Sequence, residues 1–135
     1  MTMTLTADDR TAITDVINLH GHLTDSGDFD GLREVFLPDV VYDVGDLGGG
    51  VIVGLAALRD AALALGEGNP VAHHVTNIVV TEAADGRARA ISKGIGVNAD
   101  GTTGSVTYED TLVRGDHGWR IGHRTVRARR IPLTS

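Results

Sequence analysis

Two adjacent histidines, His73 and His74, precede the β-branched run Val75 to Val80. Histidine is the side chain whose ordinary pKa lets it take or give a proton near neutral pH. Successive side chains of a strand point to opposite faces, so one imidazole should face the interior and the other solvent. A structural histidine, hydrogen-bonded and chemically idle, is the alternative. The neighbouring polar groups decide between the two interpretations.

Three further residues could take part in proton transfer or charge stabilisation. Asp25 ends the first expected helix, where a solvated helix-end carboxylate, or a cap for the helix that begins near Asp28, is the alternative to a functional role. His20 lies on the apolar stripe of that helix, where a buried, satisfied histidine is the alternative. Arg124, on the last expected strand, could bind a leaving group, a carboxylate or an enolate oxygen, or make an outward salt bridge. By strand alternation it should share a face with Val126 and Ala128, opposite Trp119, Ile121 and His123.

Two more pairs are candidates for binding a substrate. Tyr42 and Asp43 lie on a short expected strand, where a shift of one residue reverses the face. Tyr108 and Asp110 share a face of a later strand and could reach a cavity. No metal site is expected, because His73 and His74 leave opposite faces and no histidine pair is spaced i, i+4.

Composition limits the class of protein. A chain of 135 residues is expected to form a single domain, 1–135. The absence of cysteine excludes disulfides and is compatible with a reducing cytosol, so we expect a cytoplasmic protein. The net charge of -6 argues against nucleic acid as a partner. The longest apolar stretch, 51–65, is too short and interrupted to span a membrane.

The first half of the chain is expected to be mainly helical. Thr6 and Asp9 have the spacing of a capping box and predict a helix over about 7–25. Apolar residues at helical spacing predict a short second helix that begins near Asp28 and ends before Pro38. Short strands at 40–44 and 51–53 follow. An alanine- and leucine-rich third helix over 55–65 ends at Gly66.

The second half is expected to form strands. Four segments, at about 71–81, 87–98, 103–114 and 118–130, are joined by turns rich in Asp and Gly. Strands joined by short turns form an antiparallel meander. The order of elements predicts an α+β fold with about three helices packed on one face of a strongly curved, mainly antiparallel sheet.

The chain resembles the SnoaL-like group of the cone-shaped nuclear transport factor 2-like (NTF2-like) fold. The matching segments are 9–13, 25–30, 36–43, 73–77 and 118–121 followed by Arg124, so the resemblance covers nearly the whole chain. In the dehydratase-like and dehydrochlorinase-like members, an aspartate orients a strand histidine that acts as general base. The resemblance assigns these roles to Asp25 and His73. In ketosteroid isomerase-like members a tyrosine stands near the position of His20, which is a departure from that pattern.

The resemblance implies a cofactor-independent enzyme that abstracts a proton from carbon, with dehydratase-like or polyketide cyclase-like chemistry. Arg124 and His20 would then stabilise the developing anion or the leaving group. One alternative is ketosteroid isomerase-like chemistry with Asp43 or Asp110 as the base. Another is a non-catalytic ligand-binding or subunit-pairing module, like the small subunits of ring-hydroxylating dioxygenases.

The remaining expectations concern the cavity and the assembly. With 18 glycines and few aromatic residues, the chain has little bulk to fill a cone, so we expect an open cavity for a small apolar molecule, with Leu23, Val75 and Val126 in its wall. The strand 87–98 carries Ile91 and Ile95 on one face and small residues such as Ser92 and Gly94 on the other. A small, hydroxyl-rich outer face would suit sheet-to-sheet packing, as relatives commonly pair, and we expect a homodimer.

Overall fold

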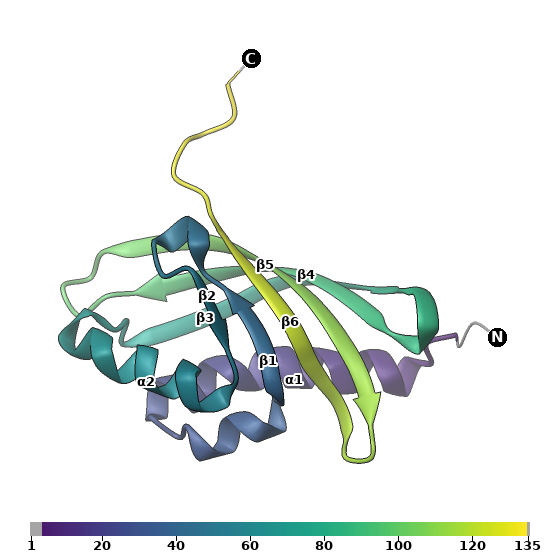
Figure 1. Ribbon diagram of the computed structural model, residues 1–135. Helices are drawn as coiled ribbons and strands as arrows, with labels where there is room; N and C mark the ends of the chain where they lie inside the picture. Colours follow the sequence, from purple (N-terminus) through teal and green to yellow (C-terminus); the bar gives the residue numbers. More distant parts are fainter. Residues whose placement is uncertain (1–3, 135) are drawn as a thin grey trace.

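A computed structural model describes residues 4–134 and shows an α+β fold in which two α-helices accompany one mixed sheet (Figure 1). The helices are α1 (Ala7–Ser26) and α2 (Leu55–Leu65). The strands are β1 (Phe36–Asp43), β2 (Val51–Val53), β3 (Ala72–Glu82), β4 (Ala88–Val97), β5 (Thr103–Gly115) and β6 (Gly118–Ala128). Single 3-10 turns connect several of them, among them η1 (Asp30–Glu34) and η3 (Gly66–Gly68).

The six strands follow the order β2-β1-β6-β5-β4-β3. All neighbours are antiparallel except β1 and β6, which are parallel. Helix α1 packs on β3 and β6, whereas α2 packs on β1 and β2. In Figure 1, α1 runs along the lower face of the sheet, with α2 beside β1 and β2. The core therefore lies between α1 and the sheet. Among the described residues, no helix has the length and hydropathy of a membrane span.

Helix α1 begins and ends where its local sequence predicts. The Thr6 hydroxyl accepts a hydrogen bond from the Asp9 backbone N–H at 3.0 Å, and an Asp9 carboxylate oxygen accepts one from the Thr6 N–H at 2.9 Å. Gly27 ends the helix in the left-handed conformation, with φ 73°. The predicted capping box is thus present, and Asp25 lies in the last turn.

The prediction of a second helix that begins near Asp28 is wrong. The segment makes only the 3-10 turn η1 and then enters β1 at Phe36. Phe36 pairs with Ile121 of β6, and the Ile121 N–H donates to the Val35 carbonyl at 2.8 Å. Pro38 lies in β1 where the register with β6 shifts, so the ladder loses little there through its missing N–H. Tertiary pairing has overridden the helical spacing, and two α-helices form instead of three.

Strand β6 contains an irregularity that changes which side chains face the core. Thr111 of β5 pairs with His123 and Leu112 with Ile121, so Gly122 is skipped as a β-bulge. Ile121 and Arg124 are consequently both buried, and Trp119 is buried with them. The predicted opposition of Arg124 to Trp119 and Ile121 is wrong, because a bulge resets strand alternation.

The faces of β4 are the reverse of those expected. Ser92 and Gly94 face the interior, whereas Ile91 and Ile95 are 49% and 41% exposed. Gly94 has to be small, because a Cβ there would lie 2.4 Å from a ring carbon of Tyr108. The small residues of β4 thus make room inside the fold, and its branched apolar residues form part of the outer surface.

Candidate active site

Asp25 of α1 and His73 of β3 are joined by two hydrogen bonds. An Asp25 carboxylate oxygen lies 2.6 Å from the His73 Nδ1, and the other accepts from the His73 backbone N–H at 3.0 Å. The two side chains are 25% and 19% exposed, so they lie at the edge of the core. An ionised carboxylate only accepts hydrogen bonds, so the neutral ring carries its proton on Nδ1 and its lone pair on Nε2. This arrangement orients an imidazole as a base.

The close approach of α1 to β3 makes this contact possible. A Cβ at Gly21 would lie 2.7 Å from the His73 carbonyl oxygen. One turn beyond Gly21, α1 presents Asp25 to the start of β3. Toward the other end of the helix, an Arg10 guanidinium nitrogen donates to the Val80 carbonyl at 2.7 Å. His74, the neighbour of His73, is exposed, as strand alternation predicts.

His20 is buried beside this pair. Its ring contacts those of Phe36, His73 and Tyr108 edge to face, with centroids 5.6, 6.1 and 6.3 Å away. Burial lowers the His20 pKa well below its usual value, and the positive charge of Arg124 and the ring of His73 add to the effect. His20 is therefore neutral at pH 7. Its Nδ1 has no hydrogen-bond partner among the described residues.

Arg124 and Asp110 form a fully buried ion pair across β5 and β6. The Arg124 Nε and Nη2 donate to the two Asp110 oxygens at 2.7 and 2.9 Å. Burial alone would lower the Arg124 pKa, but the adjacent Asp110 carboxylate raises it above its usual value. The guanidinium carbon lies 4.2 Å from the centroid of the Tyr108 ring and 5.6 Å from that of Phe36. Arg124 therefore faces the interior, and its salt bridge to Asp110 is buried and does not lie on the outer surface.

The other predicted site residues divide into interior and peripheral positions. Tyr42 and Tyr108 are buried, and this burial raises the pKa of both hydroxyls. Val126 is buried, while Leu23 and Val75 pack against the core from partly buried positions. Asp43 lies elsewhere: its carboxylate accepts from the Gly45 N–H at 2.9 Å, within its own turn.

Ser92, Gly21 and Gly94 are residues that the sequence did not single out as part of the site. The Ser92 hydroxyl is buried without a hydrogen-bond partner in the described part of the chain. Small and branched residues alternate along β4, which indicates that Ser92 and Gly94 share one face of the strand. This alternation does not indicate whether that face is the inner or the outer one. No pattern in the neighbouring sequence indicates the role of Gly21, because that role is a close contact with β3.

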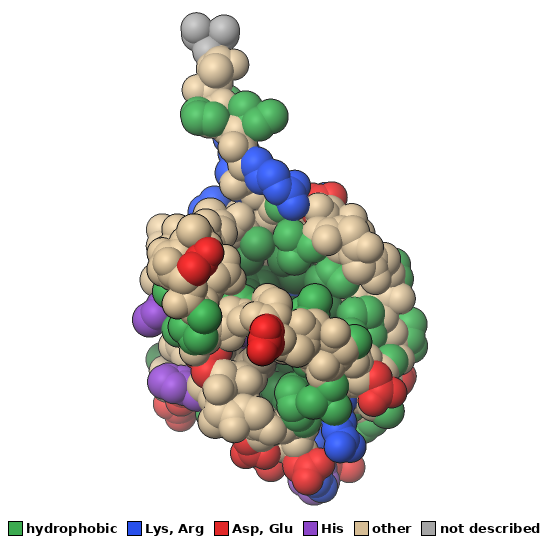
Figure 2. All heavy atoms as spheres, turned by 90° about the vertical axis from the view of Figure 1, so that its left-hand side faces the viewer, with side chains coloured by type: hydrophobic (Ala, Val, Ile, Leu, Met, Phe, Trp, Pro, Cys, Tyr) green, Lys and Arg blue, Asp and Glu red, His purple; other side chains and the backbone are tan. Residues whose placement is uncertain are grey.

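The surface is hollowed at the end of the molecule that carries α2 and the β4–β5 turn. Figure 2 shows hydrophobic side chains around this hollow, below the root of the C-terminal tail. Partly buried apolar residues of β2 and α2 pack against the core, namely Ile52, Leu55 and Leu58. An apolar hollow with few polar groups is typical of a small-molecule site.

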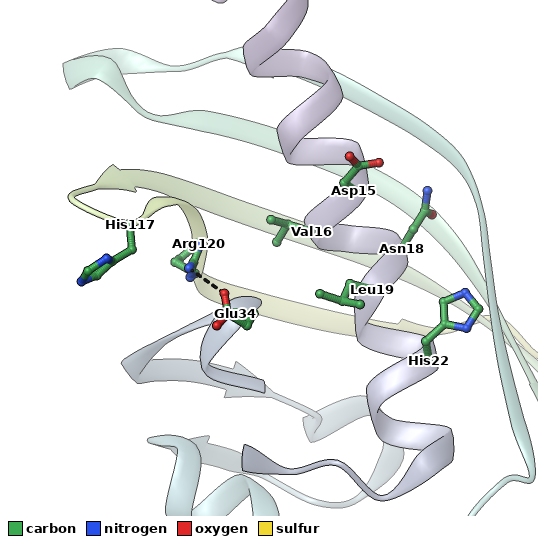
Figure 3. A pocket seen from close by; sticks show the side chains of 8 residues that line it. All are labelled: Asp15, Val16, Asn18, Leu19, His22, Glu34, His117 and Arg120. Atoms are coloured by element: carbon green, nitrogen blue, oxygen red, sulfur yellow. Dashed lines mark hydrogen bonds and ion pairs between the residues drawn. The ribbon is translucent and has the colours of Figure 1, made fainter. Parts of the chain in front are cut away.

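A second depression lies between α1, η1 and the turn from β5 to β6, and its lining does not include Asp25 or His73. Figure 3 shows its lining, with Glu34 bound to Arg120 at 3.2 Å. His22 and His117 stand at opposite ends and point away from each other. Within residues 4–134, no group of three or more histidine and acidic side chains is placed to hold a metal.

Comparison with known proteins identifies the family. Residues 5–125 match the SnoaL-like domain. The chain belongs to the SnoaL-like family, within the NTF2-like superfamily. A search of curated proteins gives no match.

Solved structures with the same fold match nearly the whole chain. A Novosphingobium aromaticivorans protein named as an aromatic ring hydroxylase is 29% identical, with a TM-score of 0.75 over 97% of this chain and 95% of its own. A protein named as a scytalone dehydratase from the same species is 18% identical, with a TM-score of 0.73 over 93% and 89%. The hexachlorocyclohexane dehydrochlorinase LinA-type3 of Novosphingobium barchaimii is 19% identical, with a TM-score of 0.75 over 92% and 89%. At their identities, the last two show a shared fold.

Proposed function

We propose that this SnoaL-like protein is a cofactor-independent lyase or isomerase that abstracts a proton from a carbon of a small, mainly apolar substrate. The observation that carries the proposal is the two-point contact between Asp25 and His73, which directs the basic Nε2 away from the carboxylate. The names of the dehydratase and dehydrochlorinase neighbours support the same class of reaction.

In the proposed reaction, the His73 Nε2 takes a proton from a substrate carbon, and the electron pair of the C–H bond moves to form a double bond. In an elimination, the bond from the adjacent carbon to the leaving group breaks, and the leaving group departs with its electron pair. In an isomerisation, the π pair of an adjacent carbonyl moves to its oxygen to give an enolate, and the imidazolium then returns the proton to another carbon. In a cyclisation, the enolate carbon forms a bond to a second carbonyl carbon of the substrate, the π pair of that carbonyl moves to its oxygen, and the imidazolium protonates this oxygen. Asp25 stabilises the imidazolium, and this kind of general base contributes about 10²–10⁴-fold.

Arg124 and His20 are proposed to stabilise the developing negative charge. Arg124 retains Nη1 for this purpose, since its Nε and Nη2 are bound to Asp110. The ketosteroid isomerase-like alternative has less support: Asp43 binds its own turn, and both Asp110 oxygens bind Arg124. A non-catalytic module would be expected to satisfy its interior polar groups internally, which His20 and Arg124 do not do.

We also propose a homodimer that uses the outer face of the sheet. Val79 of β3 pairs with Ile91 of β4, and these side chains are 55% and 49% exposed, next to Ile95. The surface proposed for pairing therefore contains exposed apolar side chains together with Lys93 and the hydroxyl of its cross-strand partner Thr107. Burying it against a second copy would remove these side chains from water.

The proposed activity is tested with two probe reactions. One is chloride release from hexachlorocyclohexane, and the other is exchange of the α-protons of cyclic ketones in D₂O, followed by NMR. Wild-type protein should accelerate at least one of them, His73→Ala should not, and His74→Ala should behave as wild type because His74 is exposed on the same strand. Equal rates for wild type and His73→Ala would overturn the proposal.

A further inference from the structure

Three buried polar atoms in the interior have no hydrogen-bond partner among the described residues: the His20 Nδ1, the Ser92 Oγ and the Arg124 Nη1. Buried polar groups are nearly always paired, and exceptions call for a water molecule or a ligand. Three such atoms on three different elements, α1, β4 and β6, call for a shared ligand if the residues that carry them lie together.

The residues that carry these three atoms are all neighbours of the Tyr108 ring. Ser92 is the cross-strand partner of Tyr108, and the missing side chain of Gly94 leaves room for the ring. The Arg124 guanidinium lies over the ring face at 4.2 Å, and the His20 ring meets it at 6.3 Å. The three unpartnered atoms therefore belong to residues that surround one aromatic side chain.

Ser92, His20 and the Arg124–Asp110 pair together offer hydrogen bonds without a net charge. The positive charge of Arg124 is balanced by Asp110, whose two oxygens it binds at 2.7 and 2.9 Å in a pair with no solvent exposure. Ser92 is uncharged, and His20 is neutral at pH 7 because burial lowers its pKa. A carboxylate placed here would lose its hydration and meet no unpaired cation, whereas a carbonyl or hydroxyl oxygen would need only hydrogen bonds.

We propose that Ser92, His20 and the Nη1 of Arg124 form a polar subsite that receives an uncharged oxygen of the ligand and selects against carboxylates. Ser92 is a specificity-determining residue of this subsite. The inference rests on the proposed function, since it describes how the substrate of that interior site is anchored, and it adds the class of substrate: a neutral carbonyl or hydroxyl compound.

The test compares three ligands that share one ring and differ in charge: cyclohexanone, cyclohexanecarboxylate and cyclohexylammonium. Binding is followed by NMR of the histidine and tyrosine ring signals. Cyclohexanone should perturb His20 and Tyr108 and bind at least about tenfold more tightly than either ion, because the carboxylate finds no unpaired cation and the ammonium group cannot accept a hydrogen bond from the Arg124 Nη1. Tighter binding of the carboxylate, or no perturbation by any of the three, would overturn the inference.

Two variants test the named residues. Ser92→Ala should weaken cyclohexanone binding about fivefold or more through its lost hydrogen bond, while Ser105→Ala, at an exposed position on β5, should not change it. Asp110→Asn leaves the guanidinium uncompensated and should shift the preference toward the carboxylate. If Asp110→Asn does not fold, the wild-type ranking and Ser92→Ala still decide. Unchanged binding in Ser92→Ala would contradict the assignment.

The inference and the proposed function can fail separately. His73→Ala leaves the subsite residues in place and should keep the ligand ranking while losing proton transfer. A wild-type protein that transfers protons but prefers the carboxylate would overturn the inference alone. A protein with the expected ranking and no dependence of proton transfer on His73 would overturn the proposed function alone.

Discussion

Gly21 of α1 lies against the backbone of His73, and a Cβ at Gly21 would stand 2.7 Å from the His73 carbonyl oxygen. Real Cβ atoms do not approach an oxygen that closely, so the absence of a side chain sets the distance between α1 and β3. The contact between Asp25 and His73 depends on that distance, since Asp25 lies one turn further along α1.

Gly21→Ala should therefore separate α1 from β3 and lengthen the hydrogen bonds of His73 to Asp25. We expect a loss of about 1–3 kcal/mol in the free energy of unfolding, the usual cost of overpacking, together with lower activity. Urea denaturation and the D₂O exchange assay measure the two effects. Gly68→Ala is the matched control, because no atom lies within 4 Å of a Cβ built there. Equal behaviour of the two variants would contradict the role of Gly21.

Asp25→Asn should slow proton abstraction without preventing folding. An asparagine amide can donate to Nδ1 and so favour the tautomer whose Nε2 is protonated and cannot act as a base. We expect kcat to fall by about 10²-fold or more with a smaller change in KM. Asp15→Asn, an exposed position on the outer side of α1, should have no effect. A change confined to KM would show that Asp25 serves binding instead.

The buried His20 should make stability depend on pH. Its folded pKa lies below the unfolded value near 6.5, so the unfolded chain binds one more proton once the pH falls below about 6.5. Its contribution is present above that pH and is lost on acidification. The urea midpoint should fall from pH 8 to pH 5 in wild type and less steeply in His20→Gln. His22→Gln, exposed on the same helix, should keep the wild-type slope.

The proposed dimer depends on the outer face of β3 and β4. Ile91→Lys should yield a monomer in light scattering or analytical ultracentrifugation, since the pairing would bury a second ammonium group beside that of Lys93 in place of an apolar side chain. Val53→Lys, at a 60% exposed position on β2, should leave the assembly unchanged. A wild-type protein that is monomeric at micromolar concentration would exclude the dimer.

Local signals in the sequence predicted most elements, and long-range pairing explains the errors. The capping box at Thr6 and the glycine after Leu65 placed α1 and α2, and the Asp–Gly turns separated the long strands. The second helix failed because the apolar residues near Phe36 pair with β6. An isolated glycine within a strand often marks a bulge, and Gly122 was the available sign that Arg124 would face inward.

The prediction of the site relied less on residue spacing than on the family resemblance. Asp25 and His73 are 48 residues apart, and only the family resemblance paired them before the structure showed their contact. Predicting the ion-pair partner of Arg124 from the sequence would have required the register between β5 and β6, in which Arg124 lies opposite Asp110. Ser92 was overlooked because either face of β4 could have been the inner one until Tyr108 was placed opposite it.

The central claim is that the His73 imidazole is the base, and chemical rescue tests it most directly. The measurement is the rate of proton abstraction by His73→Ala with and without added imidazole, with His74→Ala as the control. We expect the rate to fall by about 10²–10⁴-fold in His73→Ala and to rise with imidazole concentration, since imidazole can occupy the vacated space and take the proton. A His73→Ala protein that is folded and retains the wild-type rate without imidazole would contradict the claim.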